Sequence, residues 1–206
     1  MFCDSGIDWL ATGSMISGLG AVITGLVALW ALLVAYPDWK KRETYKARSA
    51  DARSILSAFY EGRQVIDSIR SPLTYGHEID EAQKIIDDAP ELRYLPEEVR
   101  RRHRQRIVTR SRANRHAEFW EKAFRLLPVA KAVFGDQVEA GLLTVIQARQ
   151  SVFAAVDVYP DVDDEFRPWQ EKFWKGIGKP DPIDADLDVG ENKLREHLAE
   201  YLHIKT

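Results

Sequence analysis

The longest apolar segment of the chain lies near its N-terminus. From Trp9 to Tyr36 there are 28 consecutive residues without a charged side chain, which would extend roughly 42 Å as a helix. A bilayer core needs only about 20 such residues, and the buried helices of soluble domains rarely run this long without a charge. The pattern therefore predicts a transmembrane helix.

Small and bulky side chains fall on opposite faces of this segment. Small residues recur at alternating steps of three and four positions, at Ser14, Ser17, Ala21, Thr24, Ala28, Ala31 and Ala35. We call this stripe the seam. Helices in lipid associate through close backbone packing and interhelical hydrogen bonds, and the spacing is that of left-handed helix packing. We expect the seam to be the self-association face of a parallel homo-oligomer.

Three alternatives follow from the seam. A ring of such helices can line a narrow pore that closes by dewetting at its alanines. The same face can instead pack too tightly to conduct ions. The sequence does not choose between these two. A monomeric anchor that is simply rich in glycine and alanine is the alternative to self-association.

The charges that flank the apolar segment are distributed unequally. Asp4 and Asp8 precede it, and the basic residues follow it, at Lys40, Lys41, Arg42, Lys46 and Arg48. A cleaved secretory signal has a positive stretch before a short apolar core, which is the opposite pattern. By the positive-inside rule, the N-terminus lies outside and the remainder of the chain is cytoplasmic.

Helical periodicity extends through the rest of the chain, and no alternating strand pattern or hairpin turn is present. We expect an all-α fold, with an N-out transmembrane anchor in residues 1–37, a basic juxtamembrane stalk in 38–54 and a helical cytoplasmic domain in 55–206. The helices predicted after the stalk cover residues 55–69, 78–88, 97–126, 136–158, 163–174 and 191–203, with loops at 90–96 and 176–190.

The residues that commonly carry catalysis do not form a known pattern. The single cysteine, Cys3, precludes an internal disulfide, and His77-Glu78 lacks the second histidine of a zinc-protease motif because position 81 is Glu81. No phosphate-binding loop, nucleophile elbow or dinucleotide fingerprint occurs. The sequence predicts a protein that is not an enzyme and that holds neither a metal nor a cofactor.

One polar run stands out, at residues 100–116. It holds eight arginines, two histidines and no acid. Arginine favours bidentate contacts with phosphate, so the predicted anion-binding residues are Arg100, Arg101, Arg102, Arg104, Arg106, Arg110, Arg112 and Arg115. The alternative is a solvated helix whose arginines pair with the acidic segments at 161–165 and 181–188.

The layout of the chain resembles that of the small single-pass membrane effectors of bacterial anti-phage defence. It combines an N-terminal membrane helix that bears the seam, a basic juxtamembrane stretch and a helical domain with an arginine-rich run. Among these effectors, the one to be named first for its resemblance to this chain is the channel-forming partner of Hailong-type systems. The resemblance is one of layout, and no motif corresponds residue by residue. It implies a homo-oligomer in the bacterial cytoplasmic membrane that responds to a nucleotide or oligonucleotide, with a partner enzyme encoded nearby. A non-conducting anchor or scaffold that binds a protein partner is the alternative function.

Overall fold

The computed structural model describes residues 9–158, 175 and 181–202 of the 206-residue chain, with the backbone alone for residues 9–21. Nearly all of these residues are helical, and no strand occurs among them. The fold is therefore all-α, as predicted. The helix predicted at 163–174 lies outside the described residues.

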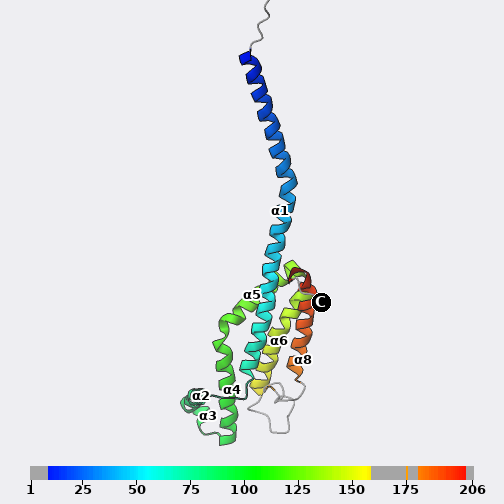
Figure 1. The fold of residues 1–206 in the computed structure, drawn as a ribbon. Helices are drawn as coiled ribbons and strands as arrows, with labels where there is room; N and C mark the ends of the chain where they lie inside the picture. The colour runs from blue at the N-terminus through cyan, green and yellow to red at the C-terminus, as the bar shows by residue number, and fades with distance from the viewer. Residues whose placement is uncertain (1–8, 159–174, 176–180, 203–206) are drawn as a thin grey trace, which may run out of the picture. The chain divides into compact units, whose positions relative to one another are not determined.

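The first helix, α1, runs without interruption from Trp9 to Ile69 (Figure 1). It contains Pro37, which lacks an N–H and therefore removes one bond of the helical ladder. The segment from Val22 onward contains a window that is long and apolar enough to cross a membrane, a criterion that a signal sequence near an N-terminus also meets. By internal contacts the chain divides into two units, Met1–Ala47 and Arg48–Thr206, and the division falls inside the stretch predicted as a stalk.

Helices α2 (Gly76–Asp88) and α6 (Asp136–Val158) confirm two of the predicted helices closely. Gly135, with a φ of 92°, ends the helix before α6, and a positive φ is readily accessible only to glycine. The loop expected at 90–96 contains a single helical turn, α3 (Pro90–Arg93).

The prediction of one continuous helix over residues 97–126 is wrong. The structure has two helices, α4 (Glu97–Arg115) and α5 (Ala117–Phe134), and Pro128 lies inside α5. The break is at His116, a residue type that carries no helix-ending signal. Because proline has no N–H, the carbonyl of Phe124 lacks its usual partner at position 128. Pro128 and Phe124 are both exposed, so water can hydrogen-bond this carbonyl.

The prediction of a loop up to residue 190 is also wrong, because α8 begins at Pro182 and runs to Leu202. Asp181 initiates it: its Oδ1 accepts a hydrogen bond from the Ile183 N–H at 2.9 Å, and Pro182 occupies the first turn. Gly190, taken as a loop residue, is buried in the helix interior.

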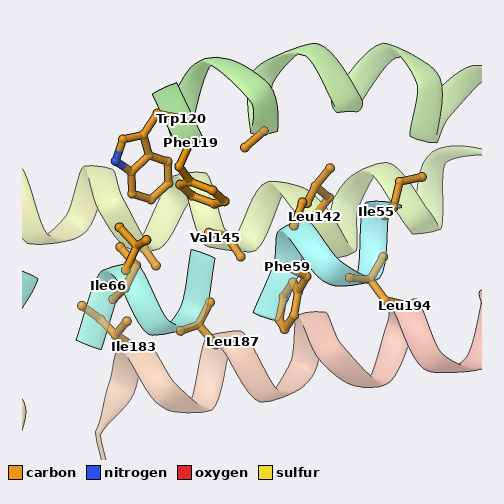
Figure 2. Close-up of a cluster of buried hydrophobic side chains, with 14 of the residues drawn as sticks. Ile55, Phe59, Ile66, Phe119, Trp120, Leu142, Val145, Ile183, Leu187 and Leu194 are labelled. Carbon is orange, nitrogen blue, oxygen red and sulfur yellow. The ribbon is translucent and has the colours of Figure 1, made fainter. Parts of the chain in front are cut away.

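The core of the second unit lies between the C-terminal part of α1 and helices α5, α6 and α8 (Figure 2). Each helix contributes one apolar stripe, which satisfies the need of a helix to bury its apolar face. The labelled core side chains are Ile55, Phe59, Ile66, Phe119, Trp120, Leu142, Val145, Ile183, Leu187 and Leu194. Helix α2 packs against α4, and α3 packs against α2 (Figure 1). Ala82 and Ile86 of α2 are buried.

Candidate functional site

The arginine-rich run forms nearly the whole of α4. Glu97 and Glu98 occupy its first turn, and Arg112 and Arg115 occupy its last turn. Acids near the N-terminus and cations near the C-terminus both interact favourably with the helix dipole. This end-to-end ordering is one reason why a helix so rich in positive charge forms here.

The structure places Arg112 in the protein interior, where it is 6% exposed. Its Nε donates to Oε1 of Glu78 at 3.1 Å, and its Nη2 donates to Oε2 of the same carboxylate at 2.6 Å. Nη1 also donates to the carbonyl of Ser71 at 2.8 Å, and Nη2 to the carbonyl of Leu73. Arg112 therefore fastens α2 and the segment before it to α4.

Glu78 is the acid at the centre of this arrangement. It is 3% exposed and also accepts a hydrogen bond from Nη1 of Arg115 at 3.0 Å. The hydrogen bonds from Arg112, together with that from the Tyr75 N–H, lower the pKa of Glu78 from 4.5 to about 2 despite its burial. Glu78 is thus a permanent counter-charge for two of the eight arginines.

The other arginines of the run are placed differently. Arg100 and Arg104 pair with Glu97, and Arg101 pairs with Glu98, one or two turns along the same helix. Such exposed pairs contribute little to stability. Arg102 is partly buried.

Asp157 of α6 is the partner of the two arginines in the middle of the run. Arg106 lies 3.8 Å from its Oδ1, and Arg110 donates to the same oxygen. Both arginines are partly exposed. Within the described residues, one carboxylate is thus shared between two guanidinium groups.

The acids that the sequence suggested as partners of the run are engaged elsewhere or lie outside the described residues. Asp181 binds Arg70 at 2.6 Å in a buried pair, and Asp188 binds Arg63 at 2.8 Å. The segment 161–165 lies outside the described residues. Glu78 was not predicted as the partner of Arg112, because 34 positions separate the two residues and no local pattern joins them.

Two small cavities are lined by residues of α4. The first, of about 160 Å³, combines cationic and apolar walls and is lined by Thr74, Ile79, Arg101, Arg104, Gln105 and Val108. The second, of about 220 Å³, is lined by Ser68, Ser71, Leu73, Tyr75, Glu78, Arg112, Arg115 and His116. The first can accept a single anionic group such as a phosphate or a carboxylate, because guanidinium groups stand at its edge. The second is less suited to an anion, because the Glu78 carboxylate is part of its wall.

The seam lies on α1. Thr24, Ala28, Ala31 and Ala35 are exposed, as is every described side chain from Val22 to Thr44. Ser14, Ser17 and Ala21 belong to the backbone-described part of the helix. Large apolar residues such as Trp30 and Leu33 are 67% and 66% exposed, so nothing in the described chain covers this apolar segment.

Within the described residues, no group of three or more histidine, cysteine, aspartate or glutamate side chains is placed to hold a metal ion. Comparison with protein-family models, curated proteins and solved structures gives no match.

Proposed function

We propose that this protein is a homo-oligomeric single-pass membrane protein whose cytoplasmic helical domain senses a phosphate-bearing ligand and sets the state of a pore formed by α1. The observation that carries the proposal is the complete exposure of the apolar segment from Val22 to Tyr36. Apolar surface on this scale marks contact with lipid or with another protein surface.

The seam is the basis for proposing that the chain associates with further copies of itself. Ala28, Ala31 and Ala35 offer little side-chain bulk, which lets two backbones approach closely in lipid, and the Thr24 hydroxyl can hydrogen-bond across helices. A parallel oligomer presents hydroxyls toward its outer end and alanines toward its inner end. Alanines at a narrow constriction can block ions by excluding water.

The sensing part of the proposal depends on Arg101 and Arg104. They stand at the edge of the 160 Å³ cavity, and their partners Glu97 and Glu98 are exposed acids of the same helix. Because exposed ion pairs are weak, a phosphate can compete for these guanidinium groups. Arg112, by contrast, is fully engaged by Glu78 and by two backbone carbonyls and is left out of the proposed ligand site.

The layout of the chain is also the basis for proposing a biological role. A membrane oligomer that responds to a nucleotide or oligonucleotide fits an effector of anti-phage defence in the bacterial cytoplasmic membrane. A nucleotidyltransferase or nuclease encoded beside the gene would support this role, and a solitary gene would count against it.

A second candidate function is a non-conducting anchor or scaffold for a protein partner. The observation that favours it is the pairing of most of the α4 arginines with acids of the same chain. These pairs reduce the net charge that α4 offers to a polyanion.

Ion flux separates the two functions. The purified full-length protein is reconstituted into vesicles loaded with a fluorescent ion indicator, and a short mixed-sequence single-stranded oligonucleotide is added as the probe. We expect flux that changes on addition of the oligonucleotide and that Ala28→Phe abolishes. Vesicles that contain inserted protein but show no flux with or without the probe support the scaffold.

A further inference from the structure

The cationic residues directly after the apolar segment of α1 differ from those of α4 in having few acidic neighbours. Between Asp38 and Ala47 there are four cations, Lys40, Lys41, Arg42 and Lys46, and two carboxylates. No carboxylate of the described chain pairs with Lys40, Lys41 or Arg42, and all three side chains are exposed. Lys46 has a single distant partner, Glu43, at 3.9 Å.

Two aromatic side chains stand at the start of this stretch. The rings of Tyr36 and Trp39 lie 6.1 Å apart and are each more than half exposed. Tyrosine and tryptophan concentrate at the level of lipid headgroups, where an apolar body and a polar tip are both accommodated. These residues therefore set the adjoining cations at headgroup depth.

We propose that Lys40, Lys41, Arg42 and Lys46 bind the headgroups of anionic phospholipids; this inference rests on the proposed membrane function. The partner is a lipid surface rather than a protein or a nucleic acid, because the cations begin within four residues of the apolar segment. A basic cluster of this size next to a span is attracted to the negative surface potential of a membrane. The three consecutive positions 40–42 point in different directions around a helix, which suits a ring of surrounding lipids better than a single pocket.

Each lysine or arginine near an anionic surface contributes roughly fivefold in affinity. The attraction weakens with ionic strength, because exposed charges are screened over about 8 Å at physiological salt. The inference therefore predicts a selectivity for anionic over zwitterionic lipid that is strong at low salt and reduced at high salt.

The test uses full-length protein reconstituted into phosphatidylcholine vesicles that contain spin-labelled lipid. Electron paramagnetic resonance gives the association constant of spin-labelled phosphatidylglycerol relative to spin-labelled phosphatidylcholine at the protein surface. We expect a ratio of about five or more for the wild type at low salt. The combined substitutions Lys40→Gln, Lys41→Gln and Arg42→Gln should lower the ratio most of the way toward one, because Lys46 is the one cation of the four that remains.

Two variants serve as controls. Replacing Lys84, Arg93 and Arg125, three exposed cations of the helical domain, with glutamine removes the same net charge and should leave the ratio unchanged. Lys40→Arg with Lys41→Arg keeps the charge and should retain the selectivity. A loss of selectivity in either control would overturn the assignment to these residues.

Different results overturn the proposed membrane function and the proposed binding of anionic lipid. Alkaline carbonate extraction of the same vesicles reports whether the protein is inserted. Release of the wild type into the soluble fraction overturns both the membrane function and the inference. Retention in the membrane with equal association of both lipids, or with selectivity that survives the triple glutamine substitution, overturns the inference alone.

Discussion

The guanidinium of Arg112 and the carboxylate of Glu78 form a two-point ion pair in the protein interior, with contacts of 2.6 and 3.1 Å. The two residues lie on α4 and α2, and the same guanidinium also binds the carbonyls of Ser71 and Leu73. One residue of an apparently uniform arginine run is therefore a structural element. The neighbouring Arg101, at 59% side-chain exposure, faces solvent.

This difference predicts that arginines of the run differ sharply in their effect on stability. Arg112→Ala leaves the Glu78 charge buried and only partly compensated, which should lower the free energy of unfolding by about 3–5 kcal/mol. Arg101→Ala removes an exposed pair and should change it by less than about 1 kcal/mol. Chemical denaturation of both variants in detergent makes the comparison, and equal losses would contradict the assigned roles.

The depressed pKa of Glu78 predicts acid sensitivity. Because its pKa falls from 4.5 to about 2 on folding, the ionised carboxylate stabilises the native state fully above about pH 4.5. That stabilisation, about 3 kcal/mol, is lost as the pH falls through about 2. Denaturation of the wild type and of Glu78→Gln at several pH values should show a difference that narrows below pH 4.5. A constant difference between the two across this range would refute the pKa assignment.

The crossing of α6 and α8 depends on two glycines. A Cβ at Gly190 would lie 2.1 Å from Oγ1 of Thr144 and 2.9 Å from the carbonyl oxygen of Gly141. Gly190→Ala should therefore force the helices apart and lower the melting temperature, at a cost of about 1–3 kcal/mol. Gly76→Ala is the matched control, because a Cβ there meets no atom within 4 Å. Destabilisation by both substitutions alike would show that helix crossing is not the cause.

The seam predicts that substitutions on two faces of α1 differ in effect. Ala28→Phe should separate neighbouring helices and reduce the oligomer, because bulk at a small-residue interface prevents close approach. Leu26→Phe should have little effect, because the proposed membrane function places this large side chain against lipid. Crosslinking through Cys3 and sizing in detergent both report the oligomer. Equal losses from the two changes would remove the seam as the interface.

The proposed sensing role predicts salt-dependent binding of single-stranded nucleic acid. Each phosphate neutralised by the protein contributes about −0.7 to the slope of log affinity against log salt. Combined replacement of Arg101, Arg104 and Arg106 with glutamine should weaken binding and make that slope less negative by about 2.

The same triple variant should keep its melting temperature, because the ion pairs it removes are at the surface. Arg63→Gln, which breaks pairs with Asp188 and Glu191 instead, controls for a general loss of charge. If the wild type binds no oligonucleotide at low salt, the sensing role has no support among these residues.

Much of the helical content could be read from periodicity, and the errors have local causes. Helix α6 was predicted closely, because Gly135 ends the preceding helix and a new helix starts at Asp136. The break between α4 and α5 was missed because His116 carries no such mark. The start of α8 was placed too late because Pro182 and Gly190 suggested a loop. In the structure, Pro182 occupies the first turn and Gly190 allows close packing against α6.

The sequence alone determined the features that depend on order along the chain. These are the length of the apolar segment, the spacing of the seam, the charge asymmetry around it and the all-α class, since each follows from helical periodicity and from neighbours within a few residues. Only the tertiary structure decided which arginines are buried and which are exposed. Arg112 and Arg101 are alike as sequence, but the packing of α2 against α4 buries one of them beside Glu78 and leaves the other in solvent. Burial and pairing between distant segments arise from packing, and residue order by itself does not encode them locally.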